Sequence, residues 1–196
     1  MPALSHRLGL WFANLYVIGM CGTIGGAMFF QFGLGEYPCP MCLLQRVFFL
    51  LSALGPAWIV QQSRRGTVTT KDYATGFGWA VMTALLGSLV SGAQTLMHIV
   101  PPDPGYAGAL LGLHLYTWAF ITFFAAAFAG GAALFLGAGR EIAEPSAAQR
   151  RAGTLTMYLL LAVIASNFIA CFFLQGLHWN MSGDPTGYVF FGDLGL

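Results

Sequence analysis

The sequence predicts an all-α integral membrane protein, a polytopic bundle of about five transmembrane helices. Hydrophobic residues make up 57% of the 196 residues and charged residues only 8%, against about 25% charged in soluble globular domains. Five apolar windows lie at 10–32, 41–60, 77–100, 113–136 and 155–177, each with about the 20 residues that a helix needs to cross a bilayer. Arg46 is the one charged residue inside them.

The same composition excludes several classes of protein. The formal net charge of +1 leaves no basic excess for a nucleic-acid binder, and four cysteines are too few for a secreted disulfide scaffold. No repeat, low-complexity tract or soluble domain interrupts the windows, and the connections are short and rich in Gly and Pro. We therefore expect residues 1–196 to form a single membrane domain.

The first window, 10–32, is predicted to be a retained span. Arg7 precedes it as in an export signal, but the apolar run is too long and no small-x-small cleavage site closes it. Gly22-x-x-x-Gly26 in this window and Ser88-x-x-x-Gly92 in the third are small-residue pairs. Such pairs allow close approach of neighbouring helices.

The Lys and Arg residues of the connections predict the orientation. They lie before the first window, between the second and third, and between the fourth and fifth, whereas the opposite connections and the tail contain only acidic charges. Because positive residues are retained inside, the N-terminus is expected in the cytoplasm and the tail from residue 178 outside. In a bacterium the outer side of the inner membrane is oxidising, so disulfide chemistry is possible there.

A C-x-x-C motif, Cys39-Pro40-Met41-Cys42, stands at the outer start of the second window. Pro40 suits the first turn of a helix, and Cys42 would lie in that turn, where N–H groups and the helix dipole favour a thiolate. Two sulfurs at this spacing can close a redox-active disulfide. Half of a metal site and an inert structural disulfide remain alternatives, although no second C-x-x-C supplies the remaining ligands of a zinc site.

Arg46 follows Cys42 by four residues, one turn deeper on the same helical face. A charge within the membrane is costly, about 2.5 to 3.5 kcal/mol at the centre on insertion scales, so such a residue is a functional candidate. A cation beneath a redox thiol would stabilise a thiolate and an anionic electron acceptor. The alternative is an arginine that extends to the membrane surface.

The third window ends near the same outer face with Gln94 and His98, which share one helical face. No glycine-rich nucleotide motif is present, so the expected acceptor for electrons from the cysteines is a lipid quinone. His98 is a candidate donor to a quinone oxygen. A histidine that is simply hydrated at the interface is the alternative.

Cys39-Pro40-Met41-Cys42-x-x-Gln45-Arg46, together with the stretch from Gln94 to His98, resembles the DsbB family of disulfide bond formation proteins. The resemblance implies a four-helix core in the bacterial inner membrane and a thiol:quinone oxidoreductase. Such an enzyme reoxidises a periplasmic DsbA-like dithiol protein and reduces ubiquinone or menaquinone.

Each matching residue has a role that the resemblance implies. Cys39 corresponds to the cysteine that exchanges with the partner, and Cys42 to the cysteine that contacts the quinone. Arg46 corresponds to the arginine that binds the quinone, and His98 to the histidine of its pocket. Gln45 and Gln94 are further candidates for the quinone site, and no metal is expected.

The chain departs from the family pattern beyond the third window. Family members carry a second cysteine pair in a long second outer loop and have four spans, whereas 101–112 has no cysteine and a fifth window follows. Direct attack of the partner on Cys39, or a different partner, would have to replace the usual relay. The remaining cysteines do not fill the gap, since Cys21 is predicted near the middle of the first span and Cys171 within the fifth.

Two rival functions remain open from the sequence. His98 and His114 flank the same outer loop and could ligate haem, or could bind zinc or copper with Cys39 and Cys42. The chain could also be a non-catalytic subunit of a membrane complex. The tail carries Trp179, Tyr188, Phe190 and Phe191, which are expected either to lie in the interface as an aromatic belt or to cover the C-x-x-C mouth.

Overall fold

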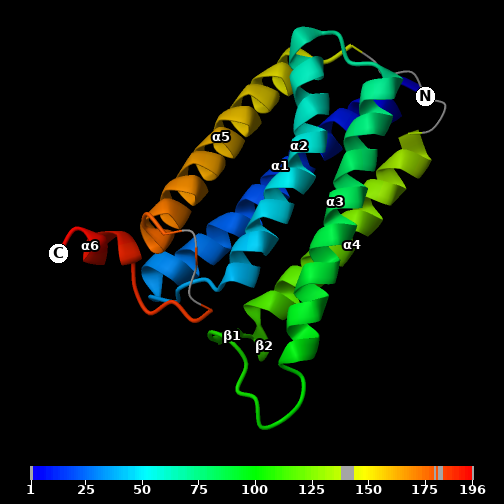
Figure 1. Ribbon diagram of the computed structural model, residues 1–196. Coiled ribbons are helices and arrows are strands. Elements are labelled where there is room, and N and C mark those ends of the chain that lie inside the picture. Colours follow the sequence, from blue (N-terminus) through cyan, green and yellow to red (C-terminus); the bar gives the residue numbers. More distant parts are fainter. Residues whose placement is uncertain (1, 138–143, 179, 181–182, 196) are drawn as a thin grey trace.

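The computed structural model describes residues 2–137, 144–178, 180 and 183–195. Five long helices run side by side, with a short hairpin and a short sixth helix at one end (Figure 1). The helices are α1 Pro2–Gly33, α2 Pro40–Arg65, α3 Thr70–Met97, α4 Leu115–Gly137, α5 Ala147–Gln175 and α6 Val189–Asp193. Strands β1 Ala109–Leu110 and β2 Leu113–His114 pair antiparallel within the loop between α3 and α4.

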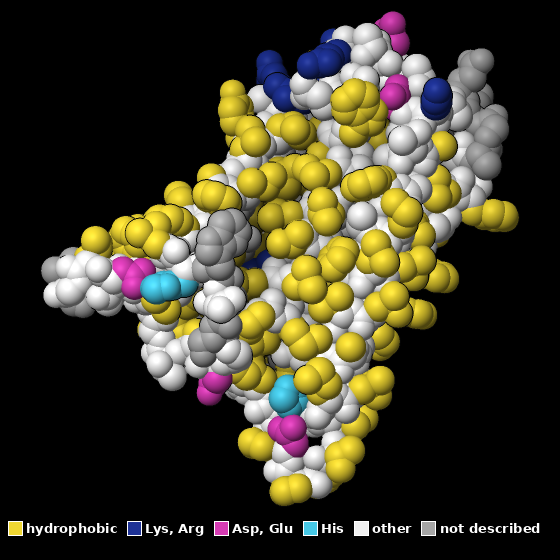
Figure 2. Space-filling model, in the orientation of Figure 1, with side chains coloured by type: hydrophobic (Ala, Val, Ile, Leu, Met, Phe, Trp, Pro, Cys, Tyr) yellow, Lys and Arg dark blue, Asp and Glu magenta, His cyan; other side chains and the backbone are white. Residues whose placement is uncertain are grey.

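The five long helices confirm the predicted all-α membrane bundle. Each is long and apolar enough to cross a membrane, counting only residues that the structure describes. Hydrophobic side chains cover the middle of the molecule and Lys and Arg gather at one end, shown uppermost in Figure 2. We call this the basic end; the opposite end, where α2 begins, is the outer end. Large apolar side chains face outwards, whereas the polar side chains of Gln31, Gln45 and Arg46 are buried. A lipid bilayer favours this arrangement, because polar groups must be satisfied inside the protein.

Helix boundaries differ from the apolar windows where local signals are stronger than hydropathy. At the basic end α3 and α5 start earlier than 77 and 155, because Thr69 and Ser146 form capping boxes with Asp72 and Gln149. At the outer end α3 stops at Met97 rather than at 100. Proline at 101 disfavours helical backbone in the residue before it.

The helix order in space is α5, α1 and α2 on one side and α3 and α4 on the other (Figure 1). Helix α3 packs along both α2 and α4, and α5 packs on α1 and α2, whereas α1 and α4 touch only sparingly. Two glycines let α2 and α3 approach closely, since a Cβ on Gly55 or Gly76 would collide with the facing backbone. Of the small-residue pairs expected to pack helices, Gly92 does so against Phe120, but Gly22 and Gly26 face open space.

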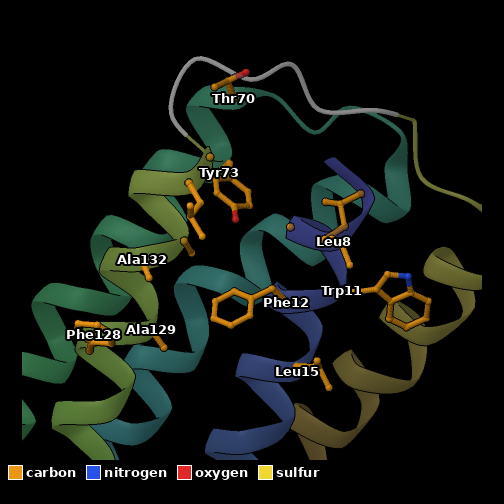
Figure 3. Close-up of a pocket in the computed structure, with 14 residues that line it drawn as sticks. Leu8, Trp11, Phe12, Leu15, Thr70, Tyr73, Phe128, Ala129 and Ala132 are labelled. Atoms are coloured by element: carbon orange, nitrogen blue, oxygen red, sulfur yellow. The ribbon is translucent and has the colours of Figure 1, made fainter. Parts of the chain in front are cut away.

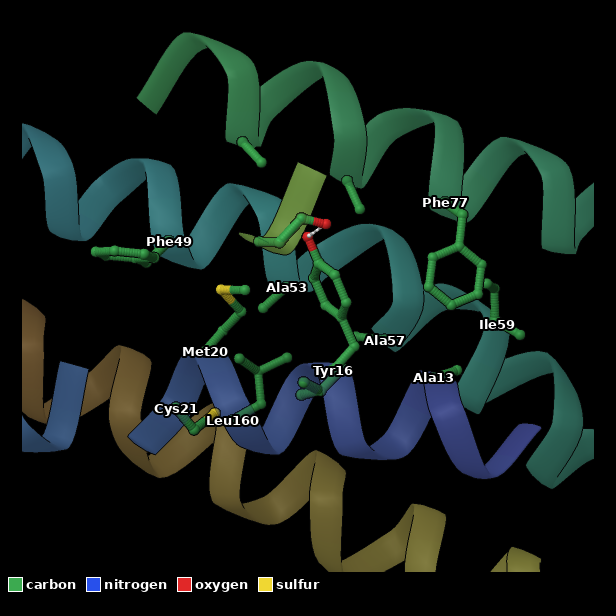
Figure 4. Packing of buried hydrophobic residues seen from close by; sticks show 14 of the residues in the cluster. Ala13, Tyr16, Met20, Cys21, Phe49, Ala53, Ala57, Ile59, Phe77 and Leu160 are labelled. Carbon is green, nitrogen blue, oxygen red and sulfur yellow. Dashed lines mark hydrogen bonds between the residues drawn. The ribbon is translucent and has the colours of Figure 1, made fainter. Parts of the chain in front are cut away.

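The core lies midway along the bundle, where α1 to α4 meet. Tyr16 reaches from α1 across to α2 (Figure 4), its hydroxyl 2.8 Å from Ser52 Oγ and 3.4 Å from the carbonyl of Ala126 on α4. Phe49 of α2 stacks on Phe123 of α4 with ring centroids 3.8 Å apart. This buried contact fixes α2 against α4 just below the outer end, where the predicted site residues lie.

Candidate active site: a dithiol beside a buried arginine

Cys39 is the N-cap of α2 and is 5% exposed. The backbone of Cys39 is extended, and Pro40 is the first helical residue. The Cys39 sulfur accepts a hydrogen bond from the backbone N–H of Cys42 at 3.2 Å. An N-cap side chain normally satisfies such an N–H of the first turn. The first-turn N–H that was expected to stabilise a thiolate at Cys42 therefore serves the sulfur of Cys39.

Gln94 of α3 contacts both sulfurs. Its amide nitrogen lies 3.3 Å from the Cys39 sulfur and 3.7 Å from the Cys42 sulfur. Its amide oxygen accepts a 2.8 Å hydrogen bond from Gln45 Nε2. Because Gln45 holds the oxygen, the nitrogen of Gln94 points at the cysteines. The structure thus brings together Cys39, Cys42, Gln45 and Gln94, from two neighbouring helices.

These contacts lower the pKa of Cys39 below that of an ordinary thiol. The largest cause is the hydrogen bond from the Cys42 side chain, and the Cys42 N–H and the Gln94 amide add to it, while burial opposes them. A donor stabilises the thiolate more than the thiol. Both sulfurs are free thiols in the structure, so this describes the reduced state.

Arg46 is buried, at 5% exposed, one turn below Cys42. Its Nη1 donates to Gln31 Oε1 at 2.7 Å and its Nη2 to the carbonyl of Ala27 at 3.1 Å, both on α1. Within the described part of the chain no carboxylate pairs with it. It does not extend to the surface, and a buried guanidinium with neutral acceptors alone leaves its positive charge uncompensated.

A cavity of about 210 Å³ lies at the outer end between α1, α2, α4 and the outer loop. It is smaller than the roughly 300 to 1,000 Å³ usual for drug-sized ligands, so it suits a single ring with a few substituents. Its lining is mostly apolar. The lining includes Gly22 and Gly26 of α1, Cys42, Gln45 and Arg46 of α2, and Tyr116 and Trp118 of α4.

The outer loop closes over this cavity. The Tyr106 hydroxyl donates to the carbonyl of Tyr37 at 2.8 Å, and the N–H of Gly108 donates to Glu36 Oε1 at 3.1 Å. Tyr37, Glu36 and Tyr106 all line the cavity. The second oxygen of the Glu36 carboxyl group is buried without a hydrogen-bond partner.

A larger cavity of about 580 Å³ lies at the basic end (Figure 3). It is bounded by α1, α3 and α4, and residues such as Trp11, Phe12 and Phe128 line it. Neither a cysteine nor a charged residue is in its lining. It has the chemistry of a lipid-chain groove and offers no redox group, so the smaller cavity is the candidate active site.

His98 and His114 lie outside the lining of the smaller cavity. His98 Nδ1 is 2.9 Å from Asp103 Oδ2, and His114 Nδ1 is 3.1 Å from the carbonyl of Ala107. The ring of Tyr116 packs against both, with ring centroids 5.4 Å and 5.2 Å away. The described residues contain no group of three or more His, Cys, Asp and Glu side chains placed to hold a metal ion.

The other two cysteines are separate from the dithiol. Cys21 is buried in the apolar core near Met20 and Leu160 (Figure 4). Cys171 on α5 is half-buried and is not part of the cavity lining.

Gln31 is a site residue that the sequence did not single out, as are Glu36, Tyr37 and Tyr106 of the cavity lining. It is 2% exposed and binds Arg46 through its oxygen and the Tyr188 hydroxyl through its nitrogen, at 3.3 Å. Its signal in the sequence is a long polar side chain inside an otherwise apolar window. The aromatic tail residues Tyr188, Phe190 and Phe191 pack on the outer ends of α1 and α5, whereas Trp179 lies outside the described residues.

The fold and the site define a multi-pass helical membrane protein with a buried dithiol at the mouth of its second span. Comparison with known proteins identifies the family: the family model of disulfide bond formation protein DsbB matches residues 9–108, which contain both cysteines and Arg46. The chain belongs to the DsbB family and is a membrane oxidoreductase of disulfide bond formation.

Individual relatives support this assignment. Disulfide bond formation protein B 1 of Pseudomonas fluorescens strain Pf-5 is 35% identical over 149 residues, covering 61% of this chain and 88% of the relative. The proteins of Aromatoleum aromaticum and Chromobacterium violaceum are 31% and 36% identical over 53% and 51% of this chain, and over 59% and 56% of their own lengths. No solved structure matches the chain.

Proposed function

We propose that the protein is a thiol:quinone oxidoreductase of the bacterial inner membrane. It reoxidises a DsbA-like dithiol protein outside the membrane and passes the electrons to ubiquinone or menaquinone. The observation that carries the proposal is the cavity that Cys42 and Arg46 line together. Its apolar walls suit a quinone ring, and its buried arginine can donate to a ring oxygen.

The orientation in the proposal follows from the basic end. Arg64, Arg65, Arg150 and Arg151 lie in the last turn of α2 and the first turns of α5. Positive residues favour the cytoplasmic side. The outer end with Cys39 and Cys42 then faces the oxidising compartment, where a thiol partner can reach it.

Thiol exchange starts from the Cys39–Cys42 disulfide. A partner thiolate attacks the Cys39 sulfur, a mixed disulfide forms, and Cys42 leaves as a thiolate beside Arg46. The second partner thiol then attacks its own mixed-disulfide sulfur, and Cys39 leaves as the thiolate that Gln94 and the Cys42 N–H stabilise. The partner is oxidised by two electrons, which the reduced cysteine pair now holds. Cys39 is 5% exposed, so the partner must displace side chains that cover its sulfur.

The quinone, when bound, supplies an acceptor for two electrons and two protons. Arg46 places a positive charge in the cavity wall next to Cys42. Gln31 and the carbonyl of Ala27 keep its guanidinium in place. Gln45 and Gln94 hold the cysteines in register between α2 and α3. His98 binds Asp103 and not the cavity, and we assign it to the outer loop and not to the quinone ring.

The proposal is tested by mixing purified protein, a reduced thiol partner and a short-chain quinone without oxygen, and following the ultraviolet absorbance of the quinone. We expect quinone reduction by the wild type and none by Cys42→Ser. Arg46→Met should raise the quinone KM by about tenfold or more, as expected for loss of a charged hydrogen bond of about 1.5 to 3 kcal/mol.

The matched control is Arg65→Met, an exposed arginine at the basic end, which should leave the KM unchanged. Reduction that persists in Cys42→Ser would refute the proposal. So would a wild-type protein that reduces neither ubiquinone nor menaquinone analogues with any DsbA-like partner.

A further inference from the structure

Tyr188, in the segment after α5, is joined to the buried arginine through one side chain. Gln31 Nε2 donates to the Tyr188 hydroxyl at 3.3 Å, and Gln31 Oε1 accepts from Arg46 Nη1 at 2.7 Å. Gln31 is 2% exposed and Arg46 5% exposed. A residue more than 140 positions later in the chain thus ends a hydrogen-bonded row that begins at Arg46.

Ring contacts fix the place of Tyr188. Its ring meets Tyr37 edge to face with centroids 5.2 Å apart and stacks on Phe32 at 6.3 Å. Tyr37 lines the cavity that holds Cys42 and Arg46. Tyr188 therefore contacts Tyr37 at the rim of the cavity as well as Gln31, which binds Arg46.

The segment that carries Tyr188 is itself anchored. The ring of Phe173 on α5 packs against Phe190 and Phe191 of α6 at 5.1 Å and 5.4 Å. His178 Nε2 lies 2.8 Å from Asp193 Oδ1, which ties the start of the tail to the end of α6. The position of the Tyr188 hydroxyl is therefore set by packing on α5.

We propose that Tyr188 is a positioning residue of the quinone site, acting on Arg46 through Gln31; the effect on quinone rests on the proposed function. A glutamine amide has an accepting end and a donating end. Because the Tyr188 hydroxyl accepts from the nitrogen, the oxygen of Gln31 faces the guanidinium. Without that acceptor the buried NH2 group loses its hydrogen bond to Tyr188. Gln31 is then less firmly held, and so is the guanidinium that donates to its oxygen.

The test compares Tyr188→Phe with Tyr158→Phe. Tyr188→Phe keeps the ring on Tyr37 and removes only the hydroxyl that binds Gln31. Tyr158 is an exposed tyrosine on α5. The first readout needs no quinone. It is the NMR spectrum of the arginine side chains in protein labelled with nitrogen-15 arginine, in which the Arg46 signals are those that disappear in Arg46→Lys. We expect Tyr188→Phe to shift these signals and to speed exchange of the guanidinium protons, and Tyr158→Phe to leave them unchanged.

The second readout is the dissociation constant of a short-chain ubiquinone analogue by titration calorimetry. Tyr188→Phe should weaken binding about threefold to tenfold, the effect of losing one neutral hydrogen bond. In a Gln31→Met background the same change should have no further effect, since Tyr188 acts through Gln31.

The two readouts separate the proposals. Unchanged Arg46 signals in Tyr188→Phe overturn the positioning role, whatever the quinone does. Shifted signals together with no quinone binding by the wild type support the contact with Arg46 and refute the quinone function. An additive loss of binding in the Gln31→Met background also overturns the inference, because Tyr188 would then act by another route.

Discussion

Cys39 and Cys42 lie in one helical turn, but their sulfurs meet different surroundings. The Cys39 sulfur is buried at the helix cap against Gln94, whereas Cys42 faces the cavity that contains Arg46. The difference comes from capping: residue 39 precedes the helix and receives the N–H of residue 42. In the proposed function Cys39 exchanges with the thiol partner and Cys42 delivers electrons toward the cavity.

We predict that Gln94→Leu raises the pKa of Cys39 in the reduced protein by somewhat less than one unit, since one hydrogen bond contributes about 1 kcal/mol and one unit corresponds to about 1.4 kcal/mol. The measurement is the pH dependence of alkylation in a Cys21→Ala, Cys171→Ala background. Gln61→Leu, which removes a hydrogen bond with Arg64 at the other end of α2, is the control. An unchanged pKa in Gln94→Leu would show that the amide does not act on the thiolate.

The lowered pKa of Cys39 also determines how the free energy of unfolding of the reduced protein changes with pH. The thiolate is stabilised in the folded state, so the contribution to the free energy of unfolding is complete above the ordinary thiol pKa of about 8.5. It decreases as the pH falls through the lowered pKa of Cys39 and is absent below it. The reduced protein should therefore lose this increment in mildly acidic solution.

At the scale of helices, α1 contributes space to the site. Gly22 and Gly26 line the cavity, and a Cβ on either would meet no atom within 4 Å. The sequence pattern predicted that this pair would pack helices, but α1 and α4 touch only sparingly. The two glycines leave room for a ligand between α1 and α4.

We therefore predict that Gly22→Val or Gly26→Val blocks quinone binding while the bundle remains stable. The added methyl groups occupy the cavity, and forcing a ring past them should cost about 1 to 3 kcal/mol, or roughly tenfold or more in the dissociation constant. Titration with a quinone analogue and thermal unfolding give the two values. Gly19→Val, on the same helix but outside the lining, should bind as the wild type does. Wild-type affinity in both cavity variants would place the quinone elsewhere.

Local pattern predicted the helices and the start of α2 well, because hydropathy, proline and C-x-x-C spacing act within a few residues. It also placed Arg46 beneath Cys42, since four residues make about one turn. It did not predict Gln31 as the partner of Arg46, or His98 turning to Asp103. Those contacts depend on how helices rotate against each other and on where α3 ends, which apolar windows do not encode.

At the scale of the whole molecule, charge divides the two ends of the bundle. Lys and Arg gather at the basic end, and the dithiol lies at the other (Figures 1 and 2). An odd number of spans then puts α6 on the side of the cysteines, as its packing on the outer end of α5 requires. The tail was expected to lie in the interface or to cover the C-x-x-C mouth; in the structure Tyr188 lies at the cavity rim beside Tyr37.

We predict the orientation from this division. In a background with all four native cysteines replaced (Cys21→Ala, Cys39→Ser, Cys42→Ser and Cys171→Ala), single cysteines at the exposed positions Pro104→Cys and Thr186→Cys should react with an impermeant maleimide in intact cells. Thr67→Cys, between α2 and α3, should react only after the membrane is permeabilised. Labelling of Thr67→Cys in intact cells would show that the orientation is the opposite one, and it would contradict the proposed function.

The row from Arg46 through Gln31 to Tyr188 also orders the assembly of the protein in time. Synthesis proceeds from the N-terminus, so Ala27 and Gln31 of α1, which bind Arg46, are made before α2. The acceptors of Arg46 are therefore already present in the chain when α2 is made. Tyr188 is made only after α5. A chain that ends before Tyr188 therefore has both Gln31 and Arg46 but lacks the Tyr188 hydroxyl that binds Gln31.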